Sequence, residues 1–170
     1  MKTKLDKALL ATTTQLASLA LLVLCGCQSP GTYTGPLVFI APPPPIIEAA
    51  HANNLEQVKA LVQENPSVVS SKDSSSGLTP LDWAAVNGNE QMVEFLLANG
   101  AEVDARSGGN GWTALHYAAN HDSIAAAQIL LAHGANVNAK GTGGETPLYR
   151  ATWNGHTDMV NWLRQHGGTE

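Results

Sequence analysis

The sequence is poor in positive charge and in cysteine. Lys and Arg number nine against 14 Asp and Glu, for a formal net charge of −5. No run of Lys or Arg occurs after the first seven residues. This argues against a nucleic-acid partner, since phosphates require clustered positive charge. The two cysteines, Cys25 and Cys27, have no further cysteine to complete a metal or redox site, and a structural zinc site uses four ligands.

A catalytic arrangement is also missing from the sequence. Two glycine-rich stretches, 108–111 and 141–144, lack the Lys and Ser or Thr of a phosphate-binding loop, so they favour hairpin tips. No two of the six histidines have ligand spacing on one helix face, and spacing indicates no Ser-His-Asp or paired-carboxylate site. We therefore predict a protein that is not an enzyme, with no cofactor, no metal and no small-molecule substrate.

The N-terminus has the layout of a secretory signal. Lys2, Lys4 and Lys7 precede an apolar run over 16–24. A signal peptide consists of such a basic start and roughly 7–15 apolar residues. A spanning helix needs about 20 apolar residues, and the polar residues at 12–15 break the stretch too early. A short transmembrane anchor is the less favoured alternative.

The end of this run, Leu24-Cys25-Gly26-Cys27, resembles the bacterial lipobox. The resemblance implies cleavage before Cys27, which would carry a diacylglycerol and an amide-linked acyl chain such as palmitate. Cys25 fits less well, because Leu24 would then occupy the small position before the cut. Several acyl chains anchor a protein stably, whereas one does so only marginally.

The resemblance gives a predicted signal peptide over 1–26 and a lipid-anchored chain in the cell envelope. Gln28 in place of Asp resembles outer-membrane sorting, facing the periplasm, if the source is Gram-negative. The first 26 residues hold three of the nine basic and one of the 14 acidic side chains, so the remainder has a net charge of −7.

Residues 27–45 are predicted to form a Pro-rich linker. Four consecutive prolines at 42–45 favour an extended polyproline II spacer that rises ~3.1 Å per residue. The segment Leu37 to Ile40 is too apolar for a solvated linker, so we expect it to pack on the domain or to belong to a partner surface.

A repeat begins after the linker. Thr-Pro-Leu or Thr-Ala-Leu starts at Thr79, Thr113 and Thr146, with spacings of 34 and 33, and the glycines at 100, 134 and 167 recur with the same spacings. Such a period indicates a repeat architecture. The pattern resembles the ankyrin repeat. It implies an all-α solenoid of about four helix-pair repeats joined by hairpin-like loops over 46–170, with repeats at about 46–72, 73–105, 106–139 and 140–170.

The residues of the second repeat show why each unit should fold as a helix pair. Thr79 is a favourable N-cap, Pro80 suits the first helical position, and Gly88 can end the first helix. Val93 and Leu96 belong to an apolar stripe on the second helix, which can be buried only against neighbouring units. The first repeat is polar outside its apolar stripe, and the fourth ends in the polar residues Asn161, Arg164, Gln165 and His166, so both are predicted to cap the stack.

The resemblance also implies a binding surface, because ankyrin repeats bind partners through variable positions on their concave groove. We predict that these positions bind a protein partner here: Trp83, Trp112, Tyr117, His121, Arg150 and Trp153. Trp, Tyr and Arg dominate binding hot spots. The alternative is that the aromatic rings only pack between repeats.

The predicted function is thus a lipid-anchored protein–protein interaction scaffold in the envelope. It could serve as an immunity protein or as an anchor for an envelope enzyme. The rival hypothesis is a surface-exposed effector or adhesin-like binder of a host or neighbour-cell protein.

Overall fold

The computed structural model describes residues 43–170, which contain eight α-helices and one short 3-10 helix. The predictions for the signal peptide, for Cys27 and for the linker as far as residue 42 lie outside the described residues. The α-helices form four consecutive pairs: α2 (Pro45–His51) with α3 (Leu55–Glu64), α4 (Pro80–Val86) with α5 (Glu90–Ala98), α6 (Ala114–Asn120) with α7 (Ile124–Ala132), and α8 (Pro147–Trp153) with α9 (Thr157–Gln165). No helix within 43–170 is both long and apolar enough to cross a membrane.

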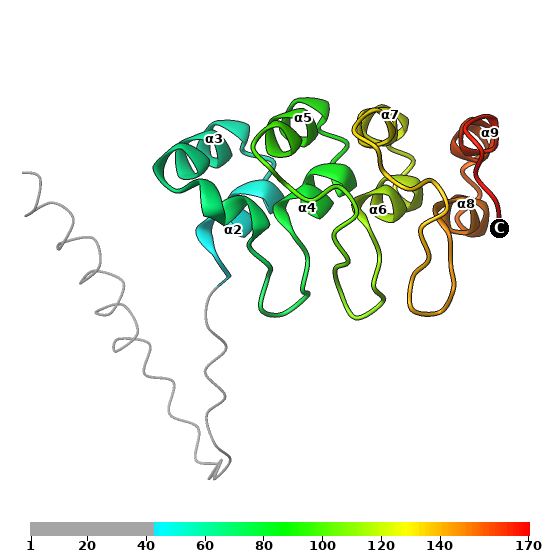
Figure 1. Ribbon diagram of the computed structural model, residues 1–170, viewed down its shortest axis with the longest axis horizontal. Coiled ribbons are helices and arrows are strands. Elements are labelled where there is room, and N and C mark those ends of the chain that lie inside the picture. The colour runs from blue at the N-terminus through cyan, green and yellow to red at the C-terminus, as the bar shows by residue number, and fades with distance from the viewer. Residues whose placement is uncertain (1–42) are drawn as a thin grey trace, which may run out of the picture. The chain divides into compact units, whose positions relative to one another are not determined.

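The pairs stack side by side in two layers (Figure 1). The first helices of the pairs, α2, α4, α6 and α8, form one row, which we call the inner helices. The second helices, α3, α5, α7 and α9, form the other row, the outer helices. Three long loops between the pairs project past the inner helices (Figure 1). This arrangement confirms the predicted all-α repeat solenoid with hairpin-like loops.

The inner helices α4, α6 and α8 begin where the repeated Thr predicts, whereas α2 begins after Pro44. Thr79 and Asp82 form a capping box on α4: the Thr79 hydroxyl accepts the Asp82 N–H at 3.2 Å, and the Asp82 carboxylate accepts the Thr79 N–H at 2.7 Å. Gly88 ends the same helix with φ of +63°. In the next repeat Asp122 holds that left-handed position with φ of +57°, a conformation that Asp tolerates better than most residues.

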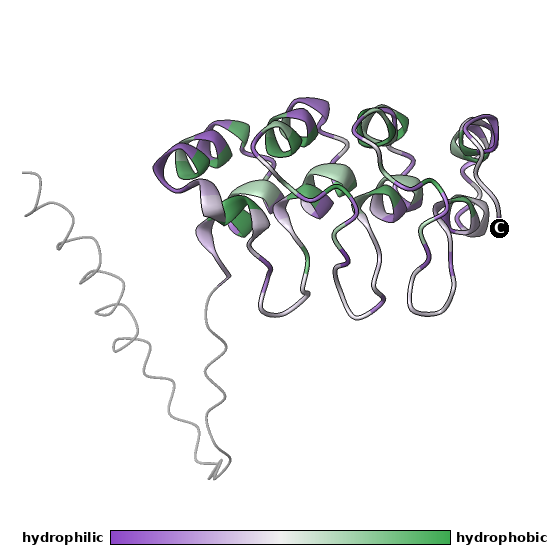
Figure 2. Ribbon diagram, viewed as in Figure 1, coloured by the Kyte–Doolittle hydropathy of each residue, from purple (hydrophilic) through white to green (hydrophobic). Residues whose placement is uncertain are grey.

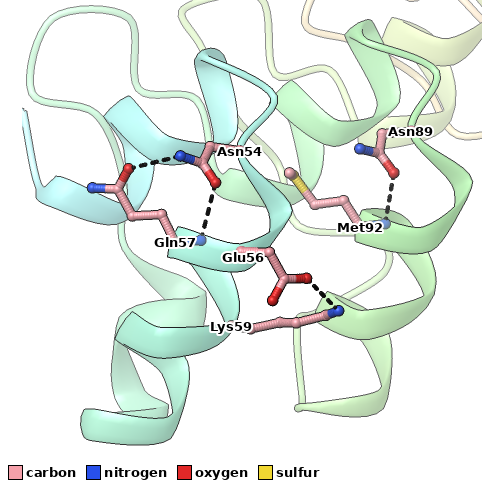
Figure 3. Close-up of polar contacts among 6 residues, drawn as sticks. All are labelled: Asn54, Glu56, Gln57, Lys59, Asn89 and Met92. Carbon is pink, nitrogen blue, oxygen red and sulfur yellow. Dashed lines mark hydrogen bonds and ion pairs between the residues drawn. The ribbon is translucent and has the colours of Figure 1, made fainter.

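Asparagines start two of the outer helices (Figure 3). The Asn54 side-chain oxygen accepts the Gln57 N–H at 3.1 Å, and Asn89 accepts the Met92 N–H at 3.0 Å. Each satisfies an N–H group that has no partner within the first turn of a helix.

Apolar residues face the contact between the two rows and between neighbouring repeats (Figure 2). Small side chains at Ala84 and Ala118 are fully buried, and they allow adjacent inner helices to pack closely. The outer helices contribute large apolar residues, of which Leu96 and Leu130 are 0% exposed. Trp162 is half-buried and packs against this core at the position that Phe95 occupies in the second repeat.

The first and last repeats, at the two ends of the stack, each have a feature that the inner repeats lack. After α3, a 3-10 helix, η1 (Pro66–Ser70), places Val69 in the core; the sequence pattern did not predict this element. At the other end α9 is polar on its exposed side, as expected. The inner helix α8, by contrast, exposes Tyr149 and Trp153.

We expect Leu96→Ala and Leu130→Ala each to lower the free energy of unfolding by about 2–5 kcal/mol, because truncation of a buried leucine leaves a cavity. Urea or thermal unfolding measures the loss. Gln128→Ala, on the exposed side of α7, is the matched control and should change stability little. Equal stabilities for all three variants would show that the helix faces are assigned wrongly.

Candidate functional site

Hairpin loops build one border of the candidate surface. In the second of the three, Ser107 and Trp112 form an antiparallel bridge, with N···O distances of 2.9 and 3.1 Å between their backbones. Adjacent loops are joined in turn, since the Thr142 N–H donates to the Asn110 carbonyl at 2.8 Å. The glycine-rich stretch 108–111 lies at this hairpin tip, where Gly108 and Gly111 have positive φ. The loops therefore hold the start of each inner helix in a fixed register.

Three of the predicted residues meet between the third and fourth repeats. The Trp112 and Tyr117 rings lie edge to face, with centroids 5.3 Å apart. Arg150, from α8, places its guanidinium carbon 4.3 Å from the Trp112 ring centroid, within the range of a cation–π interaction. Its Nη2 also donates to Asn120 Oδ1 at 2.7 Å. A hairpin, α6 and α8 thus contribute to one cluster of aromatic and cationic side chains.

Trp83 occupies in α4 the position that Arg150 occupies in α8, and it lies between the first and second repeats. Its half-buried ring contacts His51 at the end of α2, with centroids 4.4 Å apart. His121 is exposed immediately after α6. The pKa of His121 is lowered, mainly by partial desolvation and also by the neighbouring His156. Trp83 lies on α4 and His121 directly follows α6, so both residues come from the inner helices.

Trp153 lies apart from the other predicted residues. It is 70% exposed, and its ring stacks on Tyr149 with centroids 6.1 Å apart. Its counterpart one repeat earlier, Asn120, contacts the following repeat through Arg150. The position of Trp153 therefore faces the C-terminal end of the stack. Tyr149, 39% exposed, is the residue that sequence reasoning missed; it occupies the position of His116, which the following repeat covers.

Several polar atoms of this surface are buried without a hydrogen-bond partner in the described chain. The indole nitrogens of Trp83 and Trp112 and the Nε of Arg150 are such donors, and Glu145 Oε2 is such an acceptor. An unmade hydrogen bond of a buried group is costly.

His116 connects two repeats and is fully buried. Its Nδ1 accepts the Thr113 N–H at 3.1 Å, which leaves Nε2–H to donate to the Glu145 carbonyl at 3.0 Å. Burial lowers the pKa of His116. Asp82 occupies the same position in the second repeat, and burial raises the pKa of its carboxyl. His116 thus joins the third repeat to the loop before α8, and Asp82 caps α4 through Thr79.

The described residues place no metal-binding group together: within 43–170, no three or more His, Cys, Asp and Glu side chains are arranged to hold an ion. The surface consists instead of aromatic rings, one cation and amide groups. An α-solenoid with such side chains along its inner helices belongs to the class of repeat proteins that present an extended contact surface.

The family model of ankyrin repeats in three copies matches residues 11–107 and 104–170, nearly the whole chain. The chain belongs to the ankyrin-repeat family. Ankyrin repeats are generally protein–protein interaction modules and typically not enzymes. No curated protein matches the sequence.

We expect the free energy of unfolding to fall as the pH drops below 6.5, the ordinary pKa of histidine. The folded chain keeps His116 neutral, so the unfolded chain binds the proton more readily and acid favours unfolding. Urea unfolding between pH 7.5 and 5.5 measures the effect. His116→Gln should unfold more easily at pH 7.5, by about 1–3 kcal/mol, since buried hydrogen bonds are lost. It should also lose less stability on acidification; parallel pH profiles for the two proteins would contradict the assignment.

Proposed function

We propose that the protein is a binding scaffold, anchored by lipid in the cell envelope, that recognises a partner protein through the surface of its inner helices. We call the residues Trp83, Trp112, Tyr117, His121 and Arg150, with the helices and hairpin that carry them, the inner face. The observation that supports this surface is the contact of Arg150 with the Trp112 ring, 4.3 Å away, beside Tyr117.

The chemistry of the inner face favours protein recognition. Rigid aromatic rings provide contact area at low entropic cost, and Trp, Tyr and Arg are the residues most often found in hot spots. Arg150 is held over Trp112 and by Asn120, so little side-chain entropy is lost when a partner binds.

The charge of Arg150 indicates what the partner would supply. Since the chain has a net charge of −5, Arg150 gives the inner face a local positive group suited to an acidic residue.

The envelope location rests on the N-terminal sequence. The lipobox-like segment Leu24 to Cys27 supports Cys27 as the acyl acceptor, and the Pro-rich residues before α2 would hold the repeats away from the membrane. An immunity protein that neutralises a toxin, or an anchor for an envelope enzyme, would both use this arrangement. The alternative is a surface-exposed effector or adhesin-like protein, whose partner belongs to a host or neighbouring cell.

We expect Trp83→Ala and Arg150→Ala to weaken partner binding by about thirtyfold, or ~2 kcal/mol, while leaving the fold intact. Affinity isolation from envelopes identifies the partner, and calorimetric titration then measures each variant. Trp162→Ala, which removes a half-buried tryptophan from the outer helix α9, is the matched control and should retain affinity. If both inner-face variants bind as tightly as the unaltered protein, the partner docks elsewhere.

Metabolic labelling with palmitate should be lost in Cys27→Ala and kept in Cys25→Ala, because only Cys27 has the small Gly26 before the cut. Fractionation of the membranes then reports whether the labelled protein stays attached. Labelled Cys27→Ala protein would overturn the proposed anchor without affecting the proposal for the inner face.

A further inference from the structure

The outer helices carry a shallow groove that is separate from the inner face. It has a volume of about 470 Å³ and crosses the exposed side of α5, between α3 and α7. We call it the outer groove, and its lining includes Leu55 and Lys59 of α3, Glu90, Glu94 and Phe95 of α5, and Ile129 of α7. Because described helices border it on both sides, the groove lies within the stack and not at either end.

The floor of the outer groove is apolar. Leu55, Phe95 and Ile129 are half-buried, and each packs against the hydrophobic core. The part of each side chain that lines the groove remains in contact with water. An apolar side chain laid on these three residues would remove that surface from water, which is favourable in proportion to the area buried.

The rim of the outer groove is negative. Glu90 and Glu94 lie one turn apart on the exposed side of α5, where like charges repel each other. Glu90 forms no ion pair within residues 43–170, and Glu94 contacts the His133 imidazole, which offsets charge only when it is protonated. Lys59 is the one Lys or Arg of α3, α5 and α7, and its Nζ is bound to Glu56 Oε1 at 2.9 Å (Figure 3). The two carboxylates of α5 therefore lack a Lys or Arg partner in the described part of the chain.

The shape and the charge of the groove together indicate what it would accept. It is open on its outer side, so a small molecule would stay largely exposed, whereas small-molecule pockets bury most of the ligand surface. A membrane surface with anionic headgroups would be repelled by Glu90 and Glu94. A protein segment can cover an open groove and place cations on its rim.

We propose that the outer groove binds a segment of a partner protein in which a Leu, Ile or Phe side chain is flanked by Lys or Arg. The apolar side chain lies on Leu55, Phe95 and Ile129, and the cation lies between Glu90 and Glu94. Two carboxylates one turn apart both attract the cation, which relieves their mutual repulsion and selects a basic partner. The charged contact is exposed, so binding weakens as the ionic strength rises. This inference is independent of the proposed inner face, which lies on other helices.

A display library of random peptides tests the charge. It is selected in parallel on the full-length chain, on Glu90→Lys with Glu94→Lys, and on a control, Glu64→Lys with Glu102→Lys, which reverses two exposed carboxylates outside the groove. Peptides lost on the first variant and retained on the control should pair Lys or Arg with Leu, Ile or Phe, and charge reversal should weaken them at least about tenfold. They should bind Trp83→Ala normally. A selection without such peptides, or equal losses on the control, overturns the proposal and leaves the inner face unaffected.

Substitution of the floor then tests the apolar contact, with one selected peptide and fluorescence anisotropy. Leu55→Ser should weaken binding of that peptide roughly fivefold, because it removes apolar surface that the peptide covers. Leu61→Ser removes a leucine that is likewise half-buried on α3 but lies outside the groove, and it should leave the affinity unchanged. Circular dichroism at the temperature of the titration confirms that both variants are folded. Equal affinities of the two variants would overturn the role of the floor.

Discussion

Burial of apolar side chains between neighbouring repeats is the interaction on which the rest of this structure depends. A single helix pair of about 33 residues cannot cover its own stripe of Leu, Val and Ala side chains, so it is stable only in a stack. The fully buried alanines, such as Ala84 and Ala118, bring inner helices close enough for the leucines of the outer helices to be buried as well. This contact fixes the spacing of the hairpins and hence of every side chain on the inner face.

Polar groups repeat with the same period and give the stack its register. Lys72 Nζ donates to the Arg106 carbonyl at 3.0 Å, and Arg106 in turn donates to the Lys140 carbonyl. On the opposite ends of the inner helices, Asn87 donates to the Ala50 carbonyl at 3.0 Å. Because each of these bonds joins a side chain of one repeat to a backbone carbonyl of the neighbouring repeat, the bonds are specific to one alignment of adjacent repeats. Apolar burial alone would allow neighbouring units to slide.

The same aromatic residues contribute to packing and offer a binding surface. Trp83 and Trp112 are half-buried between repeats, which holds their rings rigid while one side stays accessible. Tyr117, at 7% exposed, contributes more to packing than to contact with a partner. A surface assembled from such residues needs no large rearrangement to bind, and its shape depends on the integrity of the stack.

The sequence by itself determined the repeat, its helix pairs and their caps, because these features depend on local patterns. The recurring Thr, the glycines and the apolar stripes predicted α4 to α9, and the family match agrees with them. The sequence also indicated the variable positions of the inner face.

Only the tertiary structure decided which of those residues are in contact. Arg150 contacts Trp112 across 38 positions of the chain, whereas Trp153, three residues further along, faces the end of the stack beside Tyr149. The period gives each residue its place within a repeat, but whether a neighbour covers that place depends on the packing of the next helix pair.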